Sequence, residues 1–313
     1  MQHRFAGRRA ASAVSCLLAG ALLLSACGAG PSSSAAGNVS AGGRINVVTS
    51  TNVYGSIVEK IGGSKVQVSS IINKPSQDPH SYEVTPQDKL AVSKAQLAIV
   101  NGGGYDDFFG KLAGDGTLAA GNTVNVVDLS GLRTDANKDT FNEHVWYSLP
   151  TVTKLADTIS GRLGTLDPAD AATFRANAAA FKTSVAGISA KLAALKAKYD
   201  GDPVAITEPV PLYMLQAAGL ANRTPESYSH AIEEGSGVPA TVLKEATGLI
   251  TAKDARFLAY NDQTEGPQTE TVKKAAEAAG VPVVNFSETL PDNRDYLGWM
   301  TDNANNIEQA LAK

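Results

Sequence analysis

The chain has 313 residues with 27 basic and 31 acidic side chains, and this mild negative charge argues against nucleic acid as a partner. Its two cysteines, Cys16 and Cys27, both lie in the first 27 residues, so the rest of the chain has neither disulfides nor thiolate metal ligands. The remaining residues, about 270, can bury a large core and suit two lobes.

Residues 1–26 have the pattern of a secretory signal peptide. Three arginines precede an apolar run that is too short to span a bilayer comfortably. The run ends in Leu24-Ser25-Ala26-Cys27-Gly28, which resembles a bacterial lipobox and implies cleavage before Cys27 and its lipidation. An ordinary signal peptide with a chance cysteine is the alternative. Residues 27–43 are rich in Gly, Ser and Ala, which predicts a flexible tether.

Residues 44–166 are predicted to form an N-terminal lobe, because short apolar runs alternate with helical patterns as in parallel βαβ units. Thr85 suits an N-cap, Pro86 the first turn of the helix, and Asp88 lies three residues on. The glycines at 102–104 predict a tight turn, since the Lys-Ser/Thr of a phosphate-binding loop is missing. We expect strands at 45–50, 66–72, 97–101 and 124–128, and helices at 54–61, from 86 onward and near 151–163.

Residues 167–200 are predicted to form one linking helix, because the segment from Ala169 to Tyr199 has no proline and a single glycine, Gly187. A helix from Pro168 to Tyr199 would be roughly 48 Å long, and two helices broken near Gly187 are the alternative. The C-terminal lobe, 201–313, resumes the alternation, with strands expected at 203–207, 256–260 and 281–286 and helices at 211–218, 269–279 and 295–312. The predicted fold class is therefore α/β, with two (β/α) lobes that contain parallel sheets and are joined by one long rigid helix.

Four residues that can bind a metal follow strands or loops, two in each lobe. His80 follows the strand 66–72, His144 lies beyond a polar loop, Glu208 follows the strand 203–207 and Glu288 follows the strand 281–286. Ligands bind at the carboxyl ends of parallel strands, and two imidazoles with two carboxylates suit a divalent first-row metal. For each residue the alternative is a turn, capping or surface role. His230 lies in a polar stretch that we interpret as a surface loop.

Two sequence motifs surround the histidines. The first is Asp78-Pro79-His80-Ser81-Tyr82-Glu83-Val84-Thr85-Pro86, which is close to the pattern Asp-Pro-His-x-Tyr-Glu-x-Thr-Pro. The second is Asn142-Glu143-His144-Val145-Trp146, which is similar to the pattern Asp-Pro-His-x-Trp, with Asn142-Glu143 in place of Asp-Pro. Through these motifs the chain resembles the metal-binding receptors (cluster A-I) of bacterial ABC importers for zinc, manganese or iron. The Asn101-Gly102 step, the lipobox and the long helix also fit, and the resemblance covers residues 44–313.

The resemblance implies a site with four ligands. Two are His80 and His144, and the third is Glu208, at a position where typical zinc receptors have His and typical manganese receptors have Glu. The fourth ligand is usually Asp after a late strand. Here Glu288 stands at that position, with Asp262 as the alternative.

The resemblance also implies that the protein is not an enzyme. We expect a monomeric, lipid-anchored, extracytoplasmic solute-binding protein that delivers a divalent transition metal to an ABC permease. Zinc receptors of this family often carry a His- and Asp-rich loop between the two histidine positions, whereas residues 106–142 contain no histidine here. This difference and the carboxylate at Glu208 slightly favour Mn²⁺ over Zn²⁺, although the Irving–Williams order keeps zinc a close competitor. A receptor for an organic solute such as an amino acid is the main alternative. A membrane-anchored metallohydrolase is disfavoured, because no His-Glu-x-x-His occurs and four ligands leave no position for water.

Overall fold

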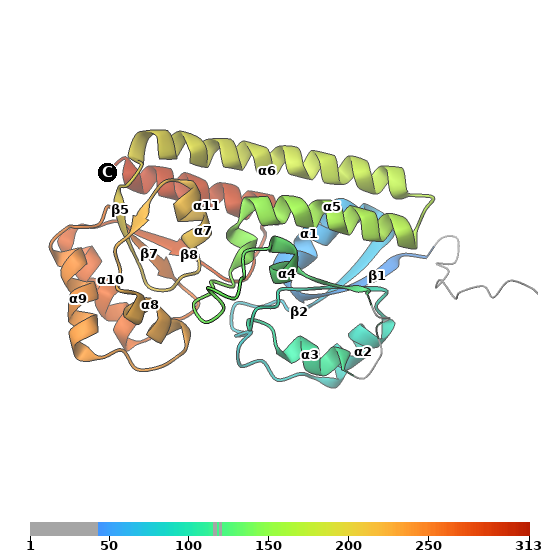
Figure 1. The fold of residues 1–313 in the computed structure, drawn as a ribbon, viewed down its shortest axis with the longest axis horizontal. Coiled ribbons are helices and arrows are strands. Elements are labelled where there is room, and N and C mark those ends of the chain that lie inside the picture. The colour runs from blue at the N-terminus through green and yellow to red at the C-terminus, as the bar shows by residue number, and fades with distance from the viewer. Residues whose placement is uncertain (1–42, 115–117, 119–120) are drawn as a thin grey trace, which may run out of the picture. The chain divides into compact units, whose positions relative to one another are not determined.

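The structure is a computed structural model that describes residues 43–114, 118 and 121–313 (Figure 1). All the described residues belong to one compact unit. The signal peptide, Cys27 and all but the last residue of the tether lie outside the described residues, so these predictions and the lobe boundaries stay predictions. In the described part of the chain, no helix combines the length and the apolar character needed to cross a membrane.

Two parallel sheets of four strands each form the framework, which confirms the predicted α/β class. The order of the strands is β2-β1-β3-β4 in the first sheet and β6-β5-β7-β8 in the second. In the first sheet Val47 pairs with both Val68 and Leu97, and in the second Ala259 pairs with both Ile206 and Val284. The strands are β1 (Ile45–Thr51), β2 (Val66–Ile72), β3 (Leu97–Val100), β4 (Thr123–Asn125), β5 (Pro203–Ile206), β6 (Ala221–Asn222), β7 (Leu258–Asn261) and β8 (Val283–Phe286).

Helices separate the strands in both halves of the chain. Those before residue 167 are α1 (Asn52–Gly62), η1 (Gly63–Lys65), α2 (Pro86–Lys94), α3 (Phe108–Ala113), α4 (Val126–Ser130), η2 (Val145–Tyr147) and α5 (Leu149–Leu166). The later ones are α6 (Ala171–Tyr199), α7 (Leu212–Ala217), α8 (Glu226–Glu233), α9 (Ala240–Thr251), α10 (Pro267–Ala279) and α11 (Tyr296–Leu311).

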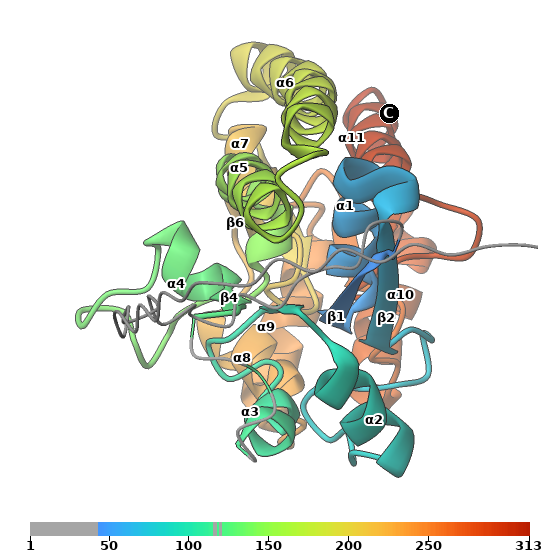
Figure 2. The same ribbon diagram turned by 90° about the vertical axis from the view of Figure 1, so that its right-hand side faces the viewer.

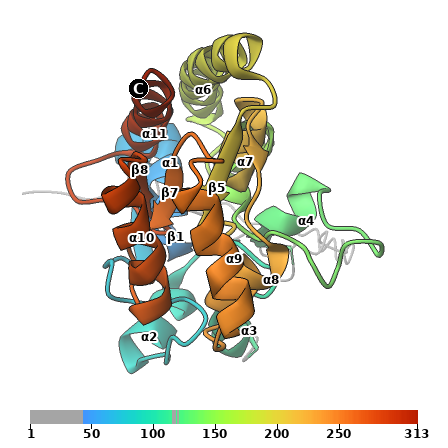
Figure 3. The same ribbon diagram turned by 90° about the vertical axis from the view of Figure 1, so that its left-hand side faces the viewer.

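The central strands β1, β3, β5 and β7 are almost entirely buried on both faces, as in sheets that are covered by helices on both sides. Side chains alternate between the faces along a strand. In β7, Ala259 therefore joins the core shared with α11, while Leu258 and Tyr260 join a second core with α8, α9 and α10. Figure 3 shows α9 and α10 on one side of β5, β7 and β8, with α11 on the other. Because the centres of the sheets are buried, polar side chains that could bind a ligand lie at the ends of the strands.

The predicted long helix is α6, which is continuous through Gly187, so the alternative of two broken helices is excluded. Its 29 residues correspond to about 43 Å. It packs against α1 and α5 of the first half and against α7 and α11 of the second (Figures 1 and 2). A single hydrophobic core runs along it, from Phe174 to Leu195, and includes residues from both sheets. The helix therefore joins the two lobes through side-chain packing as well as through its covalent backbone.

Two sequence predictions need correction. The strand expected at 124–128 ends at Asn125, whose side chain accepts a hydrogen bond from the backbone N–H of Asp128 at 3.0 Å and so caps α4. His230 is exposed as predicted, but it lies on α8 and not in a loop. The apolar residues of α8, which include Tyr228 and Ile232, are buried against the second core, and this packing stabilises the helix.

Candidate metal centre

His80 lies in a turn that its own motif builds. Asp78 accepts hydrogen bonds from the backbone N–H of His80 at 2.9 Å and from the hydroxyl of Ser81 at 2.7 Å. Thr85 and Asp88 then form a capping box that begins α2. The ring of His80 packs edge-on against Tyr105, with 5.3 Å between ring centroids. Asp78 therefore holds the turn that carries His80, and Tyr105 packs against its ring.

His144 is buried, and Asn142 fixes its tautomer. The side-chain amide of Asn142 donates to the carbonyl of Pro209 at 2.9 Å, so its oxygen faces Nδ1 of His144, 2.7 Å away. Nδ1 must then carry the proton, and Nε2 presents a lone pair, as a metal ligand requires. That Nε2 is buried and has no hydrogen-bond partner among the described residues. Trp146 packs on the ring at 5.1 Å between centroids.

Two carboxylates that the sequence analysis did not select face these imidazoles. Oε1 of Glu143 lies 3.3 Å from Nε2 of His80, and Oε1 of Glu233 lies 3.4 Å from Nε2 of His144 and 4.0 Å from Nε2 of His80. His80, Glu143 and Glu233 can each place one ligand atom within 4.8 Å of the other two. Two ligands of one ion lie about 3.0–3.5 Å apart when bonds of about 2.1 Å meet at about 90–110°, so the separations of 3.3 Å and 3.4 Å suit atoms that share a cation.

The position of Glu143 depends on the glycine turn after β3. Gly102 and Gly103 have φ of 79° and 77°, the left-handed region that favours glycine. A Cβ on Gly103 would lie 3.5 Å from Cβ of Glu143, and the side chain of Asn101 donates to the carbonyl of Glu143 at 3.0 Å. The predicted tight turn is therefore confirmed, and it brings the backbone of β3 against the loop that carries Glu143 and His144.

Glu208 and Glu288 meet on one amide in the second lobe. Glu208 follows β5 and Glu288 follows β8, and the side-chain nitrogen of Asn261, at the end of β7, donates to both, at 2.8 Å in the case of Glu288. In this sheet β6 lies on one side of β5, and β7 and β8 lie on the other. Ligands of α/β sheets bind at such a point, where the strand order changes direction. Gln263 accepts from the backbone N–H of Glu288 at 2.6 Å. Asp262, the alternative fourth ligand, is exposed.

The cluster is strongly acidic for its burial. Burial first, and then the charge of Glu288, raise the pKa of Glu143 and that of Glu208 to about 8. Burial and the neighbouring carboxylates raise the pKa of Glu233, and burial raises that of Glu288 although Asn261 and His80 act against it. Burial, with His80 nearby, lowers the pKa of His144 to about 3. A cation inside the cluster would favour the ionised carboxylates and the neutral imidazoles together.

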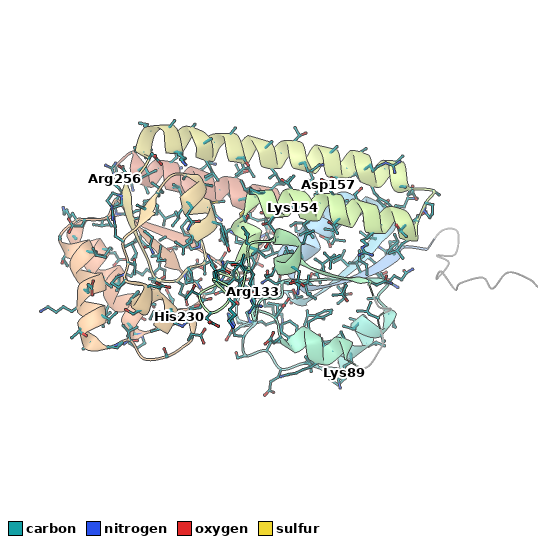
Figure 4. All side chains as sticks on the ribbon, in the orientation of Figure 1. Lys89, Arg133, Lys154, Asp157, His230 and Arg256 are labelled. Carbon is teal, nitrogen blue, oxygen red and sulfur yellow. The ribbon has the colours of Figure 1, made fainter. Side chains whose placement is uncertain are left out.

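A cleft of about 770 Å³ opens onto the cluster, and its walls include His80, His144, Glu143 and Glu233. His230 lies on the same cleft, on α8, and is labelled near the junction of the lobes in Figure 4. Residues of both lobes line the cleft. The lobes are also in contact, because the side chain of Asn142 donates a hydrogen bond to the carbonyl of Pro209, and the carbonyl of Asn142 accepts one from the hydroxyl of Tyr213 at 2.6 Å. The geometry is that of a polar ligand cluster reached from solvent between two lobes.

Residues 47–310 match the family described as ZnuA, zinc-uptake complex component A, periplasmic. The chain belongs to this family. Members of the ZnuA family are components of an uptake complex, so the chain is a binding protein and not an enzyme. This membership confirms the resemblance that the two histidine motifs indicated.

Individual relatives are distant but extend over most of the chain. The manganese ABC transporter substrate-binding lipoprotein ScaA of Streptococcus gordonii is 26% identical over 297 residues, which cover 88% of this chain and 91% of that protein. The fold is similar to that of the periplasmic zinc-binding protein TroA of Treponema pallidum, with a TM-score of 0.71, 20% identity and coverage of 87% and 100% of the two chains. The binding protein FpvC of Pseudomonas aeruginosa, solved with Mn²⁺, gives a TM-score of 0.69 at 22% identity, with 86% and 98% covered.

Proposed function

We propose that this protein is the substrate-binding protein of an ABC importer for a divalent transition metal, which it captures between its two lobes and delivers to the permease. The proposed ligands are His80 and His144 from the first lobe and Glu208 and Glu288 from the second. The observation that carries the proposal is the buried, unpartnered Nε2 of His144 within a cluster of buried carboxylates. The whole cluster belongs to one chain, so a monomer is sufficient to hold the ion.

The proposed location is the outer face of the cell membrane. Support comes from the lipobox at Cys27 and from relatives such as ScaA that are named lipoproteins. An acyl chain on Cys27, followed by the short Gly- and Ser-rich segment, would keep the binding domain close to its permease.

Among the possible cargoes, we propose Mn²⁺ ahead of Zn²⁺. The cluster contains more carboxylates than imidazoles, and oxygen ligands suit manganese better than the softer zinc. The names of relatives include both metals. Zinc remains a strong competitor, because divalent ions bind to a given site in the Irving–Williams order.

Metal analysis of the purified protein tests this proposal. We expect native mass spectrometry and elemental analysis to find one divalent transition metal for each chain, and calorimetry to give a single binding site for Mn²⁺ and for Zn²⁺. An amino-acid receptor would instead bind an organic solute and no metal. A chain that binds neither Mn²⁺ nor Zn²⁺ would contradict the proposal.

The variant Asn261→Leu tests whether Asn261 holds Glu208 and Glu288 in position to bind the metal. In Asn261→Leu, Glu208 and Glu288 lose the amide that holds them side by side, and we expect an affinity for Mn²⁺ about 10- to 100-fold lower, as for other residues that orient ligands. Asn285→Leu, an exposed position on the neighbouring strand β8, is the control and should bind as the wild type does. Calorimetry measures both affinities, and thermal unfolding verifies that both variants are folded. Equal affinities in the two variants would remove Asn261 from the site.

A further inference from the structure

Glu233 holds a position that folding alone does not explain. It is the last residue of α8, where the negative end of the helix dipole disfavours a carboxylate. Its side chain is only 13% exposed. In the described part of the chain, its only cationic or potentially cationic partners are the two imidazoles of His80 and His144. Burying a carboxylate at this place destabilises the fold unless a cation binds there.

The geometry at His144 indicates what that cation must contact. Because Nδ1 of His144 donates to Asn142, Nε2 is unprotonated and carries a lone pair, and it lies 3.4 Å from Oε1 of Glu233. Two electron-pair donors at this separation repel each other in the absence of a proton or a metal ion between them. The same oxygen lies 4.0 Å from Nε2 of His80. Glu233 is thus the carboxylate whose oxygen lies within 4.0 Å of both imidazoles.

From these contacts, and resting on the proposed function, we propose that Glu233 is a fifth ligand of the captured metal. With His80, His144, Glu208 and Glu288 it gives a coordination number above four. Zinc in closed protein sites is four-coordinate and tetrahedral, whereas Mn²⁺ takes larger shells rich in oxygen. Glu233 is therefore a residue that determines specificity and favours Mn²⁺.

The chain provides a matched control next to the ligand. Glu234 follows Glu233 directly, lines the same cleft and carries the same charge, but it is exposed and forms no ion pair with either histidine. Glu233→Gln and Glu234→Gln therefore remove the same charge from almost the same place. A difference between them reports coordination rather than the general electrostatic field of the cleft.

The experiment compares the two variants with the wild type by calorimetry with Mn²⁺ and with Zn²⁺, and by X-ray absorption of the manganese-loaded proteins. For Glu233→Gln we expect the affinity for Mn²⁺ to fall at least about 30-fold and that for Zn²⁺ less than about 5-fold, with one oxygen ligand fewer around manganese. Glu234→Gln should stay within about twofold for both metals.

Three results would overturn the inference while leaving the proposed function intact: unchanged Mn²⁺ binding by Glu233→Gln, an unchanged coordination number, or an equal loss in Glu234→Gln. A wild-type protein that binds neither metal would instead overturn the proposed function itself. Thermal unfolding of each variant shows whether a loss of binding comes from a loss of folding.

Discussion

Replacing His144 with alanine is expected to lower the affinity for Mn²⁺ and Zn²⁺ at least about 100-fold, a larger loss than that caused by residues that only orient ligands. The variant loses a buried imidazole whose Nε2 lone pair faces the carboxylate cluster. The remaining carboxylates cannot replace a nitrogen ligand held by Asn142 and packed against Trp146. Calorimetry with each metal measures the loss.

His230→Ala is the control for this experiment. His230 lies on the same cleft, but it is exposed on α8 and, unlike His80 and His144, it pairs with neither Glu143 nor Glu233. We expect its affinities to match those of the wild type. If His144→Ala, folded by circular dichroism, bound metal as tightly as His230→Ala, the assignment of His144 as a ligand would be wrong.

The metal-free protein is expected to lose stability as the pH rises from about 6.5 to about 8. Burial raises the pKa of Glu143 and that of Glu208 to about 8, from an ordinary value of 4.5. Between these values the folded state binds more protons than the unfolded chain. The free energy of unfolding therefore falls with pH, by up to about 1.4 kcal/mol for each group and pH unit.

His144 has the opposite effect at lower pH. Burial lowers its pKa to about 3, from an ordinary value of 6.5, so between these values the unfolded state binds the extra proton and stability rises with pH. The decrease caused by the two glutamates should therefore be clearest above pH 6.5. Thermal unfolding in the presence of a chelator, at several pH values between 6 and 8, measures this decrease.

Bound metal should remove most of this decrease, because the cation replaces the protons on the carboxylates and the protons are released on binding. Glu143→Gln, which lacks one of the titrating groups, should show a shallower decrease when metal-free. A melting temperature of the chelated wild type that is constant or increases between pH 6.5 and 8 would show that these carboxyls have ordinary pKa values.

Local patterns in the sequence predicted most of the framework. The strand 66–72 has the bounds of β2, and the helix that begins after Thr85 has the predicted cap. These features depend on a few adjacent residues: β-branched runs, a capping box and the glycine turn after β3. The strand predicted at 124–128 was wrong beyond Asn125, since the capping contact of Asn125 favoured a helix over continued pairing.

The candidate metal centre was only partly predictable. The motifs around His80 and His144 identify the histidines because the surrounding residues, such as Asp78 and Asn142, position each ring through local hydrogen bonds. Glu233 has no such motif. A helical spacing of Tyr228 and Ile232 could have indicated α8, but nothing near Glu233 in the sequence shows that it faces a histidine.

By itself, the sequence determined the alternation of strands and helices, the long helix α6 and the two imidazoles, because these depend on local spacing and side-chain chemistry. Only the tertiary structure decided which carboxylates meet these imidazoles, because Glu143 comes from a loop of the first lobe and Glu233 from a helix end of the second. Their convergence depends on α6, which packs against helices of both lobes, and Asn261 separately holds Glu208 and Glu288 together.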